Sequence, residues 1–417
     1  MTKFFKTNYH ILTYILLYSS LIIAFFLDEN VTSGAKSDLK FILYQVSAFE
    51  KDLIHSFLNY DTIHYTNRLS PIYIVFLTLC KKLFINFDFA RFFIIHLLIF
   101  SQIYFYKCLK LVYLKKFLIN KKILFLFSCL IFLSPSFRAN VIWVESSMFG
   151  LLFFIIGLYY YLKNFKNFKL KNVFLNILFV AIAAYFRPSY CLFSLYFFFG
   201  YFFNFKDKIS IYIVAIINLI LAFPAIYYVF ILKIFFIRIG LTNTGAFQTN
   251  YFDKIAIISS IIFFHTIPFL MYQNFSYKKN WLVVFSSLLL ALILAIFFKY
   301  DLGSGGGGLA LHMSHFITNS NYLFFLFLPV FIFYILQISK LNIKNNLLIM
   351  LILFLITPQY HIFHKYYDPL VFILCLTILD FKLLKDFFIK KRFILISYFL
   401  FLSHYLISFV NYYYIKF

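Results

Sequence analysis

Residues 107–162 read KCLKLVYLKKFLINKKILFLFSCLIFLSPSFRANVIWVESSMFGLLFFIIGLYYYL, and this stretch decides the fold class. A Lys-rich segment, residues 107–122, leads into an apolar run, and a short turn with Arg138 and Glu145 separates that run from a second one. Apolar runs of about 15 to 20 residues are typical of transmembrane helices. Since Lys and Arg accumulate in cytoplasmic loops, the Lys-rich segment is predicted to lie on the inner side of the membrane and the turn on the outer side.

The composition agrees with this class. Of the 417 residues, 64% are hydrophobic and only 12% are charged, which is more apolar surface than a water-soluble core needs. The net charge of +24 does not indicate a nucleic-acid partner, because the basic residues form short clusters between apolar runs. We therefore expect membrane lipids as partners and no nucleic acid. The five cysteines are scattered, with no close pair that would bind a metal, and are interpreted as small buried hydrophobes.

The apolar runs predict thirteen transmembrane helices. Segment 71–87 is also apolar, but Lys81 and Lys82 interrupt it, and a crossing there would place the Lys-rich segment outside. It is therefore predicted to lie along the outer surface. The first run is kept as a span because acidic residues, not a cleavage site, follow it. The predicted spans are residues 11–27, 89–106, 123–137, 146–162, 173–187, 190–204, 209–230, 255–273, 281–299, 321–339, 347–363, 369–381 and 393–411.

With the N-terminus inside, the inner segments carry 23 of the 38 Lys and Arg residues and only 3 of the 14 acids. The sequence thus predicts an all-α, polytopic integral membrane protein with about 13 transmembrane helices. Residues 1–417 are expected to form a single membrane domain. Its first outer loop, residues 28–88, is expected to contain amphipathic juxtamembrane helices.

Within this loop, apolar residues recur at helical spacing from Ile42 to Phe57, and Ser37 is a plausible N-cap. Asp38 then falls in the first turn, where the helix N-terminus favours the ionised carboxylate, so it could serve as a general base. The alternative is that Asp38 only caps the helix. The neighbouring pair Asp28 and Glu29 is either the base instead or ordinary interfacial polarity.

Three further clusters could bind an anionic, membrane-linked ligand. Glu145 and Arg138 stand together in one outer turn, where they either act on a ligand or form an ion pair with each other. Arg187 either grips a phosphate or extends to the head groups. A third cluster, in the turn TPQYHIFHKYYDPL, is either a phosphate site or a set of interfacial anchors, and consists of His361, His364, Lys365 and Asp368.

The run DLGSGGGGLALHMSHF, residues 301–316, holds a glycine cluster within the predicted outer loop 300–320. It lacks the Gly-Lys-Ser/Thr ending of a phosphate-binding loop. We expect either a flexible lid that contacts substrate through Gly305, Gly306 and His312 or a slack connector. No ligand cluster predicts a metal.

The arrangement resembles the GT-C membrane glycosyltransferases, a superfamily that includes enzymes of the protein mannosyltransferase type. The similarity covers roughly residues 11–190. The stretch SGAKSDLKFILYQVSAFEKDLIHSFLNY followed by LSPIYIVFLTLCKKLF is similar to that family's first outer loop, with Asp38 in the place of its early carboxylate. Arg91 takes the place of an arginine that commonly opens the next span, and Glu145 that of a second acid. AAYFRPSY, with Arg187, sits where relatives carry a basic residue.

The resemblance implies an inverting transfer of a sugar from a polyprenyl-phosphate donor to a lipid or glycan acceptor. Asp38 would be the catalytic base, with Glu145 orienting the acceptor or substituting for it. Arg138, Arg187, His361, His364 and Lys365 would bind the donor phosphate. No cofactor is expected, and the location would be the inner (plasma) membrane of a bacterium, with the active face on the outer, periplasmic side. A polysaccharide polymerase or ligase, or a flippase for lipid-linked sugars, remains the alternative.

Overall fold

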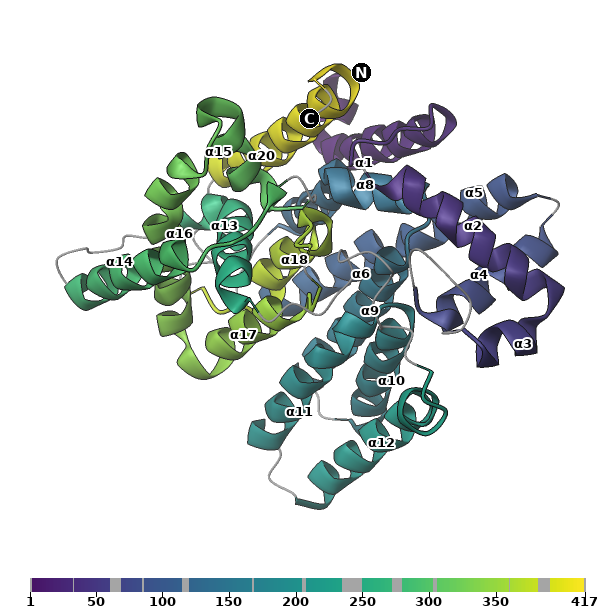
Figure 1. The fold of residues 1–417 in the computed structure, drawn as a ribbon. Coiled ribbons are helices and arrows are strands. Elements are labelled where there is room, and N and C mark those ends of the chain that lie inside the picture. Colours follow the sequence, from purple (N-terminus) through teal and green to yellow (C-terminus); the bar gives the residue numbers. More distant parts are fainter. Residues whose placement is uncertain are drawn as a thin grey trace. The chain divides into compact units, whose positions relative to one another are not determined.

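A computed structural model describes most of the chain, and its regular elements there are all helices (Figure 1). The described residues are 2–32, 34–60, 69–84, 86–114, 120–166, 169–204, 208–234, 250–271, 280–302, 306–359, 361–381 and 391–415.

Seven helical stretches of the described residues are long and apolar enough to cross a membrane. Three of them extend beyond a single named helix: Phe87–Leu114 includes two α-helices, another runs past the end of α12 to Ile231, and a third runs past the end of α20 to Tyr414. The helices involved are α1 (Thr2–Phe26), α5 (Phe87–Leu98) with α6 (Phe100–Leu109), α9 (Ser146–Lys166), α12 (Lys208–Ile226), α13 (Tyr251–Leu270), α16 (Tyr322–Leu341) and α20 (Lys391–Val410).

One further pair of helical stretches, Lys121–Leu133 and Pro135–Ile142, is apolar enough to cross when taken together, but the two meet at a bend of 65°, so the pair is either a broken span or a re-entrant loop. Its helices are α7 (Lys121–Cys129) and α8 (Pro135–Ile142). Shorter helices complete the described set: α2 (Ala35–Lys51), α3 (Leu53–Leu58), α4 (Pro71–Leu83), α10 (Leu170–Phe186), α11 (Leu192–Asn204), α14 (Trp281–Ile296), α15 (Gly308–Thr318), α17 (Leu348–Leu355) and α18 (Leu370–Thr377). The all-helical membrane class is confirmed, whereas the count of about 13 spans stays a prediction.

Large apolar side chains on the outside of these helices explain why the fold needs a lipid environment. Leu16 of α1 is 61% exposed, and Leu219 of α12 is 62% exposed. Contiguous exposed apolar faces of this kind are unfavourable in water and are satisfied by hydrocarbon.

The chain divides into two compact units. Unit 1 comprises Met1–Leu241 with Phe401–Phe417, and unit 2 comprises Thr242–Leu400. Each unit is described in turn.

In unit 1, successive long helices run in opposite directions. Phe25 of α1 packs against Phe92 of α5, and Tyr18 packs against His96, so the residue numbers change in opposite senses. The α9 and α10 helices are antiparallel in the same way. Successive connecting segments therefore lie at alternate ends of unit 1, as expected for spans that alternate across a membrane.

Helix α4 begins and ends at the same end of unit 1. The Tyr73 hydroxyl, in the first turn of α4, donates to the Val144 carbonyl. Arg91, near the start of α5, donates from Nε and Nη2 to the Ile142 carbonyl at 3.3 and 3.0 Å. Since the starts of both helices contact residues 142–144, the chain between them returns to one end. This geometry agrees with the surface placement predicted for segment 71–87.

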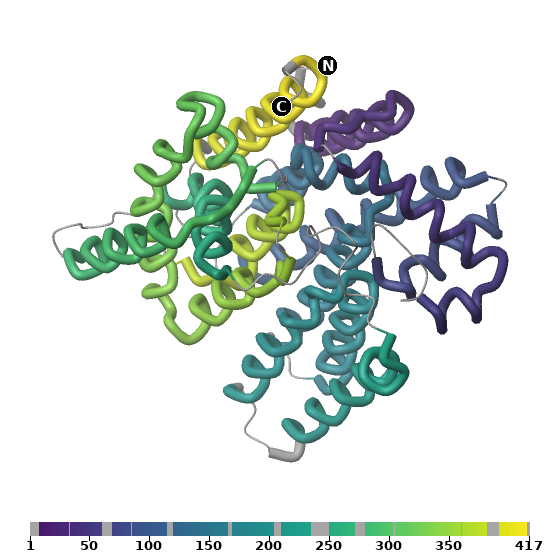
Figure 2. The backbone as a smooth tube through the Cα atoms, in the orientation of Figure 1, coloured from purple at the N-terminus to yellow at the C-terminus, as the bar shows by residue number. Residues whose placement is uncertain are grey.

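The C-terminal part of α20 lies beside α1 (Figure 2). Asn30, just after α1, donates from Nδ2 to the Tyr412 hydroxyl at 2.8 Å and from its backbone N–H to Tyr413 at 3.1 Å. Tyr412 and Tyr413 follow the last residue of α20, so the two helices finish at the same end. If both cross the membrane, the total number of crossings is odd, as it is in the predicted set of thirteen.

Unit 2 alternates likewise. The Lys299 N–H, after α14, donates to the Asp253 carboxylate in the first turn of α13 at 2.8 Å. At the opposite end, Lys340 of α16 donates to Asn280 before α14 at 3.3 Å. The α15 helix connects the end at which α14 finishes to the start of α16 at the same end, so it does not cross.

Candidate functional site

The carboxylates of unit 1 gather at one end, which we call the acidic end. It is the end where α1 finishes and where α2, α4, α5 and α9 begin. The described acidic residues of unit 1 all lie in its connecting segments or in adjacent turns, and they are Asp28, Glu29, Asp38, Glu50, Asp52, Asp88 and Glu145. The alternation of charge along the sequence therefore becomes a separation of charge in space.

Helix α2 positions Asp38. It begins at Ala35 with Gly34 as N-cap, so the prediction of Ser37 as N-cap is wrong; the Ser37 hydroxyl instead donates to the Gly34 carbonyl at 2.8 Å. Asp38 still lies in the first turn. The apolar face of α2 is buried against α4 within the protein. The predicted helix breaks at Asp52, whose extended backbone ends α2 and whose side chain caps α3. Asp38 is thus held on a packed helix.

Tyr73 links Asp38 to Glu145. Its side chain is fully buried, and burial raises the pKa of its phenol well above the usual value. The negative charges of Glu145 and then of Asp38 raise that pKa further, so both carboxylates act on the same hydroxyl. Two acids that are 107 positions apart in sequence therefore lie near enough to one tyrosine for both charges to act on it. The phenol keeps its proton and donates it to the Val144 carbonyl.

The turn that presents Glu145 is strained. Val144 has a φ of +55°, a left-handed conformation that is unfavourable for a β-branched residue and costs about 1 to 3 kcal/mol. The Glu145 N–H donates to the Asn140 carbonyl at 2.8 Å, which closes the turn. Glu145 is only 8% exposed and directly precedes α9, whose N-terminus favours a negative charge. Strain of this kind concentrates at functional sites.

Cationic side chains surround the same turn. Arg91 lies 4.5 Å from the centroid of the Trp143 ring, and the Lys36 ammonium lies 4.9 Å from it. Arg187 occupies the C-cap of α10, with its Cβ 2.8 Å from where a Cβ would stand on Gly150 of α9. Arg187 therefore reaches the acidic end one helical turn from Glu145. The geometry combines two carboxylates with three cations.

Arg138 and Glu29 form a buried ion pair beside this site. Arg138 donates to the two carboxylate oxygens of Glu29 from Nε at 2.8 Å and from Nη2 at 2.9 Å. Its other donor contacts go to Ser20 and to the Phe132 carbonyl, and the Tyr405 hydroxyl donates to Glu29 at 2.9 Å. Arg138 thus pairs with Glu29, not with Glu145 as one interpretation of the turn expected. The pair joins α1, α8 and α20.

The remaining predicted site residues belong to unit 2. Of these, Gly305 lies outside the described residues. Gly306 accepts from a ring nitrogen of His312 at 2.6 Å. The positive φ angles of Gly306 and the next two glycines form a closely packed turn: a Cβ on Gly306 would lie 2.4 Å from the Tyr300 hydroxyl oxygen. This described part of the loop is packed, not slack.

The predicted histidine cluster of unit 2 lies among aromatic side chains. His361 is 5% exposed, and the Lys365 ammonium lies 5.6 Å from the Phe363 ring. The His364 ring packs against Phe264 and His265 of α13. His265 was missed as a candidate, although a single histidine in a predicted span is itself a signal of function.

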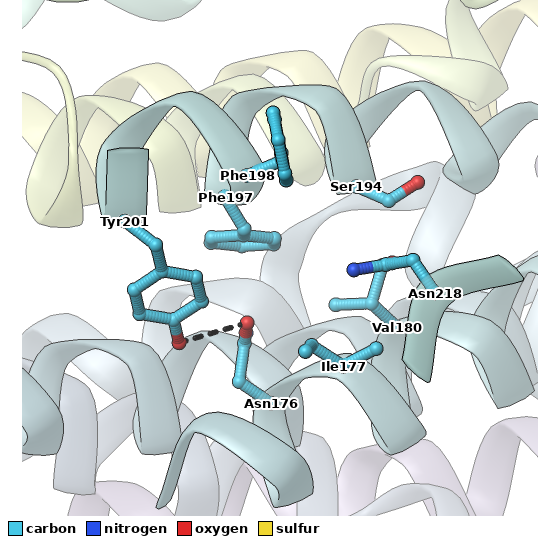
Figure 3. Close-up of a pocket in the computed structure, with 8 residues that line it drawn as sticks. All are labelled: Asn176, Ile177, Val180, Ser194, Phe197, Phe198, Tyr201 and Asn218. Carbon is cyan, nitrogen blue, oxygen red and sulfur yellow. Dashed lines mark hydrogen bonds between the residues drawn. The ribbon is translucent and has the colours of Figure 1, made fainter. Parts of the chain in front are cut away.

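A small, mostly apolar pocket lies within unit 1, between α10, α11 and α12 (Figure 3). It is too narrow to hold a water molecule. The Tyr201 hydroxyl donates to Asn176 Oδ1 at 3.0 Å, and Asn176 Nδ2 donates to the Gly157 carbonyl at 2.9 Å. These bonds satisfy polar groups between apolar helices, and no predicted site residue lines the pocket.

No protein-family model, curated protein or solved structure matches this chain. Among the described residues, no three His, Cys, Asp or Glu side chains come together as metal ligands. The function is therefore argued from the acidic end itself.

Proposed function

We propose that this protein is a membrane glycosyltransferase that moves a sugar from a polyprenyl-phosphate donor to a lipid or glycan acceptor at the acidic end of unit 1. One observation carries the proposal: Tyr73 donates to the carbonyl next to Glu145 from a helix that packs against α2, which carries Asp38, and the cationic side chains of Lys36 and Arg187 lie at the same end. Glycosyl transfer needs a base for the acceptor and positive charge for the leaving phosphate. Both kinds of group are available at this end.

In the proposed reaction, a carboxylate takes the proton of the acceptor hydroxyl as that oxygen attacks the anomeric carbon. The bond between the anomeric carbon and the phosphate oxygen breaks, and polyprenyl phosphate leaves with the electron pair. The configuration at the anomeric carbon inverts. Asp38 is the first choice for the base because it is less buried than Glu145 and lies on the packed helix α2.

Arg187 and Lys36 are proposed to stabilise the phosphate as its charge develops, whereas Arg91 already donates to Asp88 and to the Ile142 carbonyl. Guanidinium groups suit this role because they contact phosphate oxygens through two parallel hydrogen bonds. Arg138 fits the role less well than predicted, because Glu29, Ser20 and Phe132 already accept from it. The location is proposed to be a plasma membrane with the acidic end outside.

The test uses the full-length protein in lipid nanodiscs with a panel of radiolabelled polyprenyl-phosphate sugars. Asp38→Asn is expected to reduce transfer at least about a hundredfold, the scale on which a general base contributes, while polyprenyl monophosphate still binds. Full transfer by this variant would remove Asp38 from the mechanism.

Asp28→Asn is the matched control. The Asp28 carboxylate lies 3.4 Å from the Lys36 ammonium, and its side chain is 57% exposed. Its φ of +52° suits asparagine, so the variant should fold and keep its activity. Loss of transfer in Asp28→Asn with retention in Asp38→Asn would assign the base to the end of α1.

A transporter or flippase is the second candidate, and one observation favours it. Proteins that carry a substrate across a membrane place ionisable groups at depth within their spans. His265 of α13 and Asp368 are 0% and 1% exposed, respectively, within unit 2. Transport of a lipid-linked sugar without transfer in proteoliposomes would favour this candidate.

A further inference from the structure

The segment between α17 and α18 of unit 2 enters the interior of the unit without forming a long helix. Lys254, in the first turn of α13, donates to the Pro358 carbonyl at 3.0 Å, so the segment starts at the end where α13 begins. Ten residues later, Asp368 lies beside His265. His265 is 12 residues beyond Asp253, which is about 18 Å along the helix axis.

Helix α18 completes the traverse. It runs only from Leu370 to Thr377, and the Asp380 N–H after it donates to Asn346 Oδ1 at 2.9 Å. Asn346 lies at the end of unit 2 where α16 finishes. The described residues 357–359 and 361–381 therefore pass from one end to the other, with a short irregular half followed by a short helical half.

Irregular backbone at membrane depth occurs only where protein or a cavity surrounds it. In membrane proteins, such discontinuous crossings often form binding sites for substrates and ions. Here the irregular half places an ionisable side chain against a second one on α13. The irregular half of the crossing therefore also brings two ionisable side chains together.

His265 and Asp368 form that pair. His265 Nε2 lies 4.0 Å from Asp368 Oδ1, and both side chains are 0% exposed. An isolated charge in such surroundings is costly, whereas a pair with no net charge is tolerated. Two states have no net charge, namely imidazolium with carboxylate, and imidazole with carboxylic acid. Each contains one proton more than the neutral imidazole and carboxylate that water favours above about pH 7.

The surroundings supply few other titratable groups. His364 packs against His265 with its ring centroid 5.3 Å away, and the Tyr367 hydroxyl contacts Thr357 at 2.7 Å. The α14 and α17 helices, which pack against α13, carry no titratable side chain. The titratable side chains on the other helices packed against α13 are His312 and His315 of α15, Tyr322, Tyr334 and Lys340 of α16, and Cys375 of α18.

We propose that His265 and Asp368 form a proton-binding site inside the membrane-spanning part of unit 2, which holds one proton while residues 361–369 lie closed against α13. Movement of this segment away from α13 would expose both groups and release the proton. The site would thus couple a conformational change of the discontinuous crossing to proton uptake. This proposal is independent of sugar transfer at the acidic end.

The test is spectroscopic and uses the full-length protein in lipid nanodiscs. Histidines are labelled with ¹⁵N, and spectra are recorded at about pH 8.5, where exposed histidines are neutral. We expect either one persistent imidazolium signal or one infrared band of a protonated carboxyl group. Asp368→Asn should abolish either signal. His265→Gln should abolish an imidazolium signal but leave a carboxyl band in place, because a buried carboxyl group without a cationic partner keeps its proton.

Asp380→Asn is the matched control, because Asp380 is an exposed acid after the same helix. It should leave the signal unchanged. Two outcomes would overturn the proposal: absence of both signals from the wild-type protein, or persistence of the signal in Asp368→Asn. If Asp368→Asn does not fold, Asp368→Ala is recorded in its place by the same readout.

Discussion

The buried ion pair between Arg138 and Glu29 allows a quantitative test of what holds unit 1 together. The side chains are only 4% and 9% exposed, and the carboxylate accepts two hydrogen bonds from the guanidinium. Removing one partner leaves the other charge buried and uncompensated, which typically costs about 3 to 5 kcal/mol. Arg138→Gln and Glu29→Gln should each destabilise unit 1 by about this amount, which is more than a hundredfold in the unfolding equilibrium.

A double-mutant cycle separates the pair from its surroundings. If the two side chains act mainly on each other, the double variant should cost less than the sum of the single variants by about 2 to 3 kcal/mol. The exposed pair of Lys36 and Asp28 is the matched control. Its side chains are 46% and 57% exposed, so its coupling should stay below about 1 kcal/mol.

The assay is reversible unfolding in mixed micelles with a rising fraction of sodium dodecyl sulfate. Trp143 is a local reporter, because its indole N–H donates to the Glu29 carbonyl at 2.9 Å. The other tryptophan, Trp281, is 64% exposed in unit 2, and a Trp281→Phe background isolates the signal. Single variants that cost less than about 1 kcal/mol, or costs that simply add, would refute the reasoning.

Two other predictions concern the acidic end and the course of the chain. Gly150→Ala should destabilise unit 1 by about 1 to 3 kcal/mol, measured in the same unfolding assay, because the new Cβ would lie 2.8 Å from the Arg187 Cβ; a neutral result would mean that the contact is looser. Cysteines placed at Lys36, Lys171 and Tyr414 in a cysteine-free background test the topology with an impermeant thiol reagent in sealed vesicles. Lys36 and Tyr414 should be labelled from the same side and Lys171 from the other, and labelling of Lys36 and Tyr414 from opposite sides would contradict the shared end of α1 and α20.

Much of the fold follows from local composition. The surface helix α4 is visible as an apolar run that Lys81 and Lys82 interrupt, whereas the 65° bend at Pro135 falls within the predicted span 123–137 and was not predicted. Helix boundaries within the first outer loop were less predictable. The helix break at Asp52 depends on a side-chain cap. The free-energy difference between this cap and a continued helix is too small for the periodic pattern of apolar residues to reveal.

The site could be predicted only in part. Asp38 and Glu145 stood out as acids beside apolar runs, but their meeting at Tyr73 depends on how α2, α4 and the Val144 turn pack. The partner of Arg138 was ambiguous for the same reason. Glu145 is close in sequence, yet Glu29, more than a hundred positions away, accepts both hydrogen bonds.

The sequence by itself determined the solvent of this protein and the separation of its charges. A segment that crosses hydrocarbon must be a long apolar helix. Both the apolar runs and the charges between them can be identified from short stretches of sequence. Only the tertiary structure decided which ionisable groups meet, such as Glu29 with Arg138 and His265 with Asp368. The physical reason is that a buried charge must find a partner in space, and the partner that packing brings within reach need not be near in sequence.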